Sequence, residues 1–357
     1  MKVGIITIID NDNYGNRLQN YATTSFLKQM DIEVETIRND ARFNSKSRFV
    51  VNKIKNIFKK DKENQNINRI KKFDEFNENI VFSLNSVNAF TKLDNYDYVI
   101  VGSDQVWNPN FGRLRYVDLL KFIDSKKRIS FSASFGVSDI PRKLKYYAGR
   151  ALKQFKAISV RENTGKKIVE EISGRSDIEV LVDPTMLLTA EEWDKVSKKP
   201  GMLKYKKYIL NYFLGKLSEK RMDEIKRIAE ENDCEIINIL DKESPFYECG
   251  PSEFLYLEKN AFLICTDSFH SSVFAILYNV PFLVFEREDS MANMNSRLDT
   301  LLSKFELDDR RYTGKITENN LMCDYSKAYC ILDQEKVKSM KFLEKALEVG
   351  ENGGNDK

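Results

Sequence analysis

The 357-residue chain has a single histidine, His270, and this scarcity excludes several kinds of site. Metal centres built on histidine need more than one imidazole, and the five cysteines form no Cys-x-x-Cys pair that could replace them. An odd number of scattered cysteines gives no disulfide framework either, so we expect reduced thiols. We therefore expect no metal ion and no bound cofactor, and any reaction that needs an imidazole has one candidate.

Long apolar runs are also missing. No stretch approaches the roughly 20 apolar residues that a membrane-spanning helix needs, and the first ten residues, MKVGIITIID, lack the regions of a signal peptide. We therefore expect a cytoplasmic protein. With 42% apolar and 31% charged residues the composition is that of a folded protein, and the length suits two domains.

The formal net charge is only +3, but positive charge is concentrated in one segment. Residues 45–72 hold ten lysines or arginines against two acidic residues, a local excess of +8 that leaves −5 for the rest, so we expect no nucleic-acid partner. Apolar residues at helical spacing lie between these charges: Val50, Val51, Ile54, Ile57 and Phe58. Such a helix either lies on an anionic membrane, at its inner face, or packs on its own domain with lysines in water.

Short apolar, β-rich runs alternate with helical periods, which is typical of parallel α/β architecture. A strand over residues 1–9, a helix over 16–30 and a strand over 32–37 form a first βαβ unit. Further strands are predicted at 98–101, 129–133, 157–160 and 179–182, with helices over 142–155 and 162–172 between them. The first half of the chain is thus predicted to be one doubly wound domain.

A second α/β series follows a polar, lysine-rich stretch at residues 189–205, which contains Pro200-Gly201 and is predicted to be a linker. Its predicted strands are 207–212, 234–239, 261–265 and 281–285, with helices over 218–232, 251–259, 271–279 and 335–349. The sequence therefore predicts two Rossmann-like domains that face each other across a cleft, a GT-B-like arrangement. Residues 1–200 form the first domain and residues 201–357 the second, closed by the last helix.

Ligands of parallel sheets bind beyond the carboxyl ends of the strands. The polar loop at residues 10–17 follows the first strand and suits ligand contact or a helix-capping turn equally. Loop 102–108 carries polar side chains and a tryptophan directly after a buried strand, which favours a ligand site over a structural turn. Arg161 follows another strand and either pairs with a carboxylate such as Glu162 or Asp183 or binds an anionic substrate; we favour the substrate.

The most informative segment is Thr266–Ser272, between an apolar strand and an apolar helix. Its small hydroxyl residues cap the helix, and the free amides and dipole of a helix start attract an anion. His270 stands at this position. Most solitary histidines are structural, but a strand-to-helix junction on the expected cleft side favours a functional role here.

Taken in order, these segments resemble motifs of the polysaccharide pyruvyl transferase family. The matching segments are Asn13-Tyr14-Gly15 with Leu18-Gln19, Val101–Asn108, Phe131–Gly136, Ile158–Glu162, Asp183-Pro184-Thr185, Gly250-Pro251 with Phe254-Leu255, Thr266–His270, Asn295-Ser296-Arg297 and Arg310. Each motif alone is weak, whereas the ordered set is specific. Two positions depart from the family: Ser271 stands where many members have glycine, and Ser268 stands where some branches have arginine.

The resemblance implies a transferase that moves pyruvate from phosphoenolpyruvate onto two hydroxyls of one sugar residue, forming a cyclic ketal and releasing phosphate. The acceptor would belong to a capsule or exopolysaccharide, or to its lipid-linked precursor. On this interpretation the first domain binds the acceptor and the second binds the donor.

The implied roles fall into three groups. Acid–base catalysis is assigned to His270, with Asp104 as the second candidate. The residues expected to bind the donor are Arg161, Ser268, Ser271, Ser272, Arg17 and Arg297, one of the arginines replacing the one absent at position 268. The residues expected to bind the acceptor are Asn13, Tyr14, Gly15, Gln105 and Trp107.

Two other functions stay open. A glycosyltransferase of the same architecture would take a nucleotide-activated sugar, but no glycine-rich fingerprint or acidic ribose anchor stands out. A non-catalytic glycan-binding relative would bind sugar without releasing phosphate, and the presence of His270, Arg161 and Asp104 argues against this loss of activity.

Overall fold

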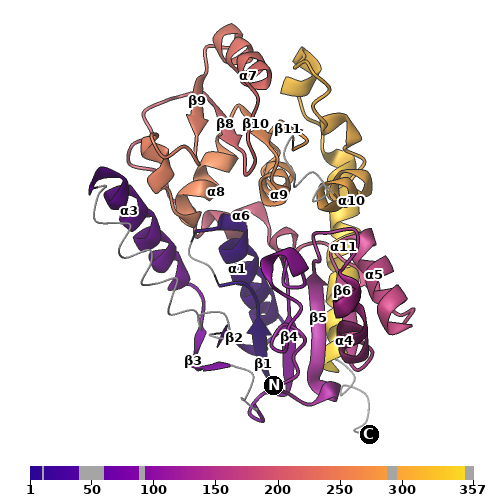
Figure 1. The fold of residues 1–357 in the computed structure, drawn as a ribbon. Helices are drawn as coiled ribbons and strands as arrows, with labels where there is room; N and C mark the ends of the chain where they lie inside the picture. Colours follow the sequence, from indigo (N-terminus) through magenta and orange to yellow (C-terminus); the bar gives the residue numbers. More distant parts are fainter. Residues whose placement is uncertain (10–11, 40–59, 88–92, 288–295, 350–357) are drawn as a thin grey trace, which may run out of the picture.

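Two parallel β-sheets organise the chain (Figure 1). The computed structural model describes residues 1–9, 12–39, 60–87, 93–287 and 296–349. The first sheet has the strand order β3-β2-β1-β4-β5-β6-β7 and the second has the order β11-β10-β8-β9, and every strand pairing in them is parallel. The predicted fold class, two Rossmann-like α/β domains, is confirmed.

The first domain is a doubly wound sheet. Its strands are β1 (Lys2–Ile6), β2 (Glu33–Asn39), β3 (Phe82–Val87), β4 (Tyr98–Val101), β5 (Arg128–Ala133), β6 (Ala157–Val160) and β7 (Glu179–Val180). Its helices are α1 (Tyr14–Gln29), α3 (Lys60–Asn77), α4 (Arg142–Leu152) and α5 (Asn163–Ser173). Side chains of α1 and of α4 with α5 belong to two separate hydrophobic clusters, one on each face of the sheet. Since both faces are covered, the central strands read as continuous apolar runs such as Tyr-Val-Ile-Val in β4.

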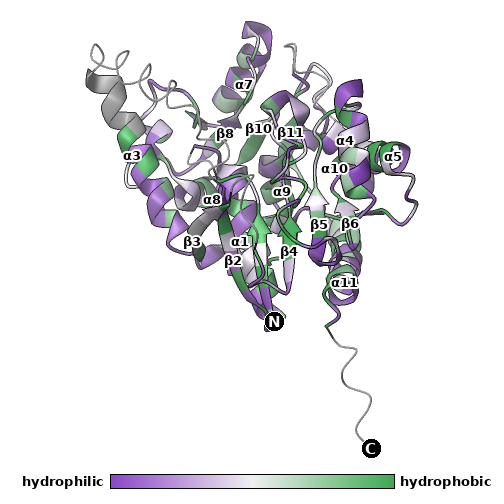
Figure 2. Ribbon diagram, turned by 60° about the horizontal axis from the view of Figure 1, so that its bottom comes forward, coloured by the Kyte–Doolittle hydropathy of each residue, from purple (hydrophilic) through white to green (hydrophobic). Residues whose placement is uncertain are grey.

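The second domain repeats this plan on a smaller scale. Its strands are β8 (Tyr208–Tyr212), β9 (Glu235–Asn238), β10 (Leu263–Thr266) and β11 (Phe282–Val284). Its helices are α7 (Glu219–Glu231), α8 (Pro251–Lys259), α9 (Phe269–Leu277) and α10 (Ser296–Lys304). Figure 2 shows hydrophobic residues gathered in the sheets, while helices at the periphery such as α7 carry hydrophilic faces.

The stretch predicted as a linker is packed between the domains. It contains the short helix α6 (Ala190–Asp194), whose capping box joins Thr189 and Glu192. The Trp193 indole is fully buried, donates a hydrogen bond to the Thr185 carbonyl (3.1 Å) and packs edge-on against Phe274 of the second domain. A polar stretch therefore carries one aromatic anchor that fixes it to both domains.

The last helix, α11 (Ser326–Leu347), begins earlier than predicted and returns to the first domain. Near its start, the Tyr329 hydroxyl donates to the Ile276 carbonyl of α9 (3.0 Å). Near its end, Phe342 stacks on Phe131 of β5, and the Lys338 ammonium donates to the Val180 carbonyl of β7 (2.9 Å). The helix thus connects the two domains along its length.

Two predicted features fall largely or wholly outside the described residues. The apolar positions of the basic segment 45–72 lie in residues 40–59, and the expected frayed tail lies in residues 350–357. None of the helices in the described ranges is apolar over a length that would cross a bilayer.

Candidate functional site

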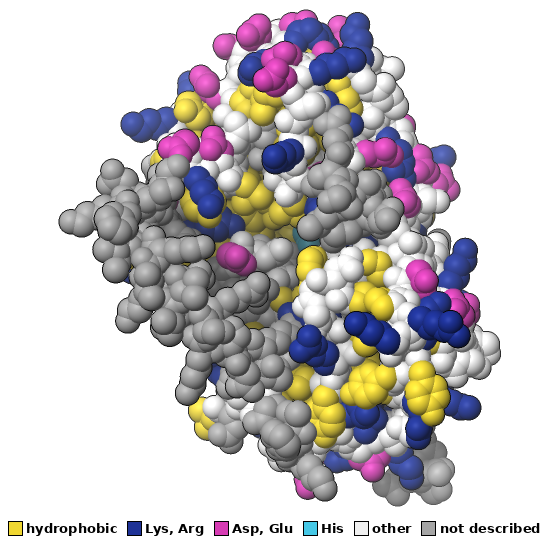
Figure 3. Space-filling view, in the orientation of Figure 1, with side chains coloured by type: hydrophobic (Ala, Val, Ile, Leu, Met, Phe, Trp, Pro, Cys, Tyr) yellow, Lys and Arg dark blue, Asp and Glu magenta, His cyan; other side chains and the backbone are white. Residues whose placement is uncertain are grey.

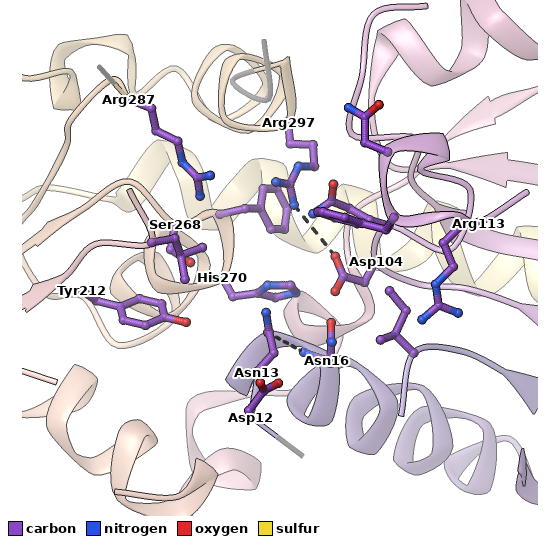
Figure 4. Close-up of a pocket in the computed structure, with 16 residues that line it drawn as sticks. Asp12, Asn13, Asn16, Asp104, Arg113, Tyr212, Ser268, His270, Arg287 and Arg297 are labelled. Carbon is purple, nitrogen blue, oxygen red and sulfur yellow. Dashed lines mark hydrogen bonds and ion pairs between the residues drawn. The ribbon is translucent and has the colours of Figure 1, made fainter. Parts of the chain in front are cut away.

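A cavity of about 700 Å³ lies between the domains, where the carboxyl ends of the two sheets face each other (Figure 4). Residues that follow β1, β4, β8 and β10 line it, together with residues beyond β11 and at the start of α10. They are Ile8, Asp12, Asn13, Asn16, Asp104, Gln105, Asn110, Phe111, Arg113, Tyr212, Leu214, Ser268, Phe269, His270, Arg287 and Arg297. In Figure 3 the imidazole appears in the hollow between the two halves.

His270 lies in the first turn of α9 and is 7% exposed. Its Nε2 atom lies 3.7 Å from Oδ2 of Asp183 and makes no hydrogen bond within the described part of the protein. Asp183 is itself fixed, because it accepts hydrogen bonds from the Ser103 hydroxyl (2.7 Å) and from the Thr185 amide (3.0 Å) and hydroxyl (2.7 Å). The carboxylate beside the imidazole is therefore held in one position by these three hydrogen bonds.

The charge of Asp183 is secured by its neighbours. Burial by itself would raise the pKa of this carboxyl, but the Arg161 guanidinium and His270 beside it hold the pKa well below its usual range. Asp183 therefore stays ionised across the working pH range.

The guanidinium of Arg161 binds carboxylates, the first of the two alternatives that the sequence left open. It pairs with Asp183 through Nη1 and with Oδ1 of Asp104 through Nη2 (3.2 Å), and it lies over the Phe269 ring. The side chain is only 1% exposed and does not line the cavity. Arg161 thus holds Asp183 and Asp104 in place from behind the cavity.

Gly15, the second residue of α1, packs directly against the imidazole. A Cβ atom at this position would lie 2.1 Å from Nδ1 of His270, far inside van der Waals contact. The absence of a side chain at Gly15 is therefore what lets the first domain approach the ring. The glycine shapes the site without lining the cavity.

Three arginines line the cavity, of which the sequence predicted only Arg297. Its Nη1 lies 3.9 Å from Oδ1 of Asp104, and burial together with the neighbouring Arg161 lowers its pKa to about 10, so it stays charged at neutral pH. Arg287 is held by Asp267 (Nε to Oδ2, 3.1 Å) and Arg113 by Asp118 (Nη1 to Oδ1, 3.5 Å). In Figure 4, Arg287 and Arg297 lie on the second-domain side and Arg113 on the opposite wall.

The start of α9 borders the cavity, but two of its three serines point elsewhere. Ser268 lines the cavity. The Ser271 hydroxyl donates to Oε1 of the buried Glu258 in α8 (2.6 Å), and the Ser272 hydroxyl donates to the Ser268 carbonyl (3.0 Å). The expected cradle of serine hydroxyls is therefore reduced to Ser268 and the helix end itself.

Of the residues expected on the acceptor side, Asn13 and Gln105 line the cavity. Tyr14 does not, because its ring is buried against Phe254 and its hydroxyl donates to the Cys249 carbonyl (2.8 Å). Trp107 is a core residue whose indole donates to the Asp118 carbonyl (3.0 Å).

Arg17 also lies away from the cavity. Its guanidinium is fully buried and donates to the Ile8 carbonyl and to the Asn77 side chain (3.3 Å). Of the three arginines expected to replace the one absent at position 268, only Arg297 faces the cavity, and it is joined there by Arg287 from the loop after β11.

Solved structures with a similar course of the chain include a glycosyltransferase from Rickettsia africae ESF-5 (TM-score 0.49, 12% identity, covering 98% of this chain and 99% of that one). The UDP-GlcNAc 2-epimerase of Methanocaldococcus jannaschii aligns with a TM-score of 0.48 and 16% identity over 96% of this chain and 92% of that one. The UDP-GlcNAc 2-epimerase of Neisseria meningitidis aligns with a TM-score of 0.43 and 13% identity over 95% of this chain and 100% of that one. No curated protein matches the sequence.

One family model matches the chain, and its description is polysaccharide pyruvyl transferase. The match runs from residue 13 to residue 290, more than three quarters of the sequence. It includes Asn13, Asp104, Asp183, His270 and Arg287, which all lie at the cavity or directly behind it.

Proposed function

Because this chain belongs to the polysaccharide pyruvyl transferase family, we propose that it transfers pyruvate from phosphoenolpyruvate onto two hydroxyl groups of one sugar residue. The products are a cyclic ketal and inorganic phosphate. The observation that carries this proposal is His270 at the start of α9, with Asp183 behind it, in a cavity that Arg287 and Arg297 also line.

The donor is expected on the second-domain side of the cavity. Phosphoenolpyruvate carries a phosphate and a carboxylate, and such groups are recognised by guanidinium forks and by helix N-termini. Arg287, Arg297 and the start of α9 at Ser268 supply both kinds of group on one wall. Residues 201–357 would therefore form the donor domain.

The acceptor is expected on the first-domain wall, which residues 1–200 provide. Asn13, Gln105 and Asn110 offer amide groups that match sugar hydroxyls, and Phe111, 48% exposed, offers a ring face at the cavity edge. The turn that carries Phe111 is braced, since the Asn108 side chain accepts from the Asn110 amide (2.9 Å). We further propose that the acceptor is a lipid-linked precursor and that the reaction takes place in the cytoplasm.

The first step would add one sugar hydroxyl to C2 of phosphoenolpyruvate. The oxygen forms a bond to C2 as the C2–C3 double bond opens, Asp104 takes the hydroxyl proton, and protonated His270 delivers a proton to C3. The product is a tetrahedral adduct that keeps the phosphate. Arg287 and Arg297 would hold its anionic groups throughout.

The second step would close the ketal. Neutral His270 takes the proton of the second hydroxyl, whose oxygen attacks C2 while the bond from C2 to the phosphate oxygen breaks. The phosphate leaves with the proton that Asp104 gained in the first step. Both side chains return to their starting states, so two hydroxyl protons end on C3 and on phosphate.

The test is phosphate release from phosphoenolpyruvate with a panel of 4-nitrophenyl glycosides and lipid-linked oligosaccharides as acceptors. We expect His270→Ala to lower kcat by about 10²–10⁴-fold, the usual contribution of acid–base catalysis. A thermal melt confirms folding, and donor binding is followed by the shift in Tm with phosphoenolpyruvate.

Equal rates for the wild type and His270→Ala would remove the imidazole from the mechanism. Stabilisation by a sugar nucleotide such as UDP-GlcNAc but not by phosphoenolpyruvate would contradict the proposed donor and support a glycosyltransferase instead. Binding of a glycan without phosphate release would point to a non-catalytic protein.

A further inference from the structure

Helix α4 carries a charged and aromatic face that the proposed reaction does not use. Residues 140–155 contain five lysines or arginines and no acidic residue. Four of these cations and one tyrosine form the exposed stripe of the helix, here called the α4 face: Arg142, Lys143, Tyr146, Arg150 and Lys153. The buried positions, such as Ala148, Ala151 and Leu152, pack on the first sheet, so the stripe points to solvent.

The aromatic ring in this stripe is unusually exposed. Tyr146 is 74% exposed, and its hydroxyl accepts a hydrogen bond from Nη1 of Arg150 (3.3 Å). A second pair extends the face, since the Lys121 ammonium lies 4.3 Å from the centre of the Tyr147 ring. Cations therefore lie against two phenol rings of α4.

The positive charge of the α4 face is not neutralised. The nearby carboxylates of Asp139 (3.0 Å) and Glu171 (2.8 Å) form ion pairs with Lys145, which flanks the α4 face. Within the described ranges, none of the four cations of the α4 face lies within salt-bridge distance of a carboxylate. A partner with negative charge would meet free ammonium and guanidinium groups.

The α4 face adjoins the segment between β4 and β5, because the Lys121 ammonium of that segment lies over the Tyr147 ring of α4. The segment between β4 and β5, which holds Phe111 and Lys121, shares one hydrophobic cluster with α4. Figure 3 shows basic and apolar side chains gathered on this part of the surface, below the hollow between the domains. A partner spread over the α4 face therefore lies next to the segment that carries Phe111.

We propose that the α4 face is a docking surface for an anionic lipid bilayer. Basic groups attract the negative surface of such a membrane, and tyrosine is one of the side chains that prefer its headgroup layer. A nucleic acid fits less well, because the cations lie on a convex helix and not in a groove. The docking itself does not require the proposed reaction, but it would bring a lipid-linked acceptor to the cavity past Phe111.

Flotation of the full chain with phosphatidylcholine vesicles, with and without 30% phosphatidylglycerol, tests this surface. We expect binding only to the anionic vesicles, with release at high salt as screening shortens the reach of the charges. The double variant Lys143→Glu with Arg150→Glu should lower the bound fraction at least tenfold. The control variant, Lys220→Glu with Lys226→Glu on α7, makes the same change in net charge on the other domain and should float like the wild type.

Several results would overturn the proposal. Equal flotation of the α4 variant and the wild type would exclude the α4 face, and charge reversal at Lys59 and Lys60 would then test the basic segment 45–72. Equal loss in both variants would show a response to net charge alone. Binding to a DNA duplex with no binding to either vesicle would identify a nucleic-acid surface. Thermal melts of both variants establish that they fold. Absence of phosphate release by the wild type would contradict the proposed function but not the docking to membranes.

Discussion

The contact between Gly15 and His270 decides how the imidazole is held. The ring lies against the backbone of α1 with no space for one more carbon atom, since a Cβ would approach Nδ1 to 2.1 Å. We expect Gly15→Ala to displace the ring and to lower kcat for phosphate release by about 10²-fold, because small misplacements of a catalytic group have effects of this size. Steady-state kinetics with phosphoenolpyruvate and the acceptor measure the change.

The matched control for this variant is Gly201→Ala. A Cβ atom at Gly201 would meet nothing within 4 Å, and the residue does not lie at the cavity. Its activity and Tm should equal those of the wild type. Wild-type activity in Gly15→Ala would show that the ring tolerates displacement, which would contradict its role as the positioned acid and base.

Part of the site could be predicted from the sequence, because the carboxyl ends of the strands mark where ligands bind. The sequence identified His270, Asp104, Asn13 and Gln105 in this way, and all four reach the cavity. It could not separate side chains that point into the cavity from those that point into the protein. Arg161, Tyr14, Trp107, Arg17 and the hydroxyls of Ser271 and Ser272 have the right residue types and positions but are bound to protein groups.

Two arginines that line the cavity were not predicted from the sequence. Neither Arg113 nor Arg287 belongs to one of the motif segments, and only the packing of the two domains turns them toward the same space. Asp183 was noted as a partner for Arg161 and as part of a motif. Its position beside His270 depends on a contact between the domains that spacing along the chain does not reveal.

At the scale of elements, helices α8 and α9 are joined by a buried acid. Glu258 of α8 accepts a hydrogen bond from Ser271, and burial raises its pKa well above the usual value. The folded state therefore holds a proton that the unfolded state releases above the ordinary carboxyl pKa. The contribution of Glu258 to the free energy of unfolding is fully present below the ordinary carboxyl pKa of the unfolded state. It is lost as the pH rises toward the raised pKa of the folded state.

We expect Glu258→Gln to remove this pH dependence. The free energy of unfolding of the wild type should fall relative to the variant by up to about 1.4 kcal/mol for each pH unit above the ordinary carboxyl range. Urea unfolding of both proteins between pH 5 and pH 8 measures the slope, and Glu230→Gln at an exposed position of α7 is the control. Parallel pH profiles for the wild type and Glu258→Gln would show that Glu258 is ionised in the folded protein.

The sequence predicted central elements better than peripheral ones. The strands β4 and β6 are observed at the predicted residues because both are short apolar runs that are buried on both faces. The edge strand β3 was not predicted from the sequence. Its Leu84 side chain is almost fully exposed, and a strand at an exposed sheet edge does not require apolar residues at every second position. The helix α6 was read as a linker because its five residues present one buried side chain, Trp193, among polar neighbours.

At the scale of the whole molecule, Arg69 of α3 fixes the two domains to each other. Its guanidinium is buried and donates to the carbonyls of Asp12 in the first domain (2.9 Å) and of Tyr247 (3.1 Å) and Cys249 (3.2 Å) in the second. The Tyr14 ring lies beneath it at 4.4 Å. This arginine belongs to the segment that the sequence marked only for its charge.

We expect Arg69→Met to weaken the whole structure. Three carbonyls would lose a charged donor, which should lower the free energy of unfolding by about 2–4 kcal/mol. The loop at Asp12 and Asn13 would also lose its tie to the second domain, so the KM for substrates should rise. Urea unfolding and kinetics measure the two effects.

The control on the same helix is Ile70→Ala, which removes an exposed side chain and should change neither quantity. If Arg69→Met were as stable as the wild type, the carbonyls would have found other donors, and α3 would not hold the domains together.

The single imidazole provides a spectroscopic probe of the cavity without any added label position to choose. Because His270 is the one histidine among 357 residues and lies in the cavity beside Asp183, selective ¹³C labelling of histidine gives a nuclear magnetic resonance spectrum with a single ring environment. That signal needs no assignment, and it follows the gain or loss of the proton at the reacting centre directly. Its response to added phosphoenolpyruvate reads out occupancy of the cleft before any acceptor has been identified.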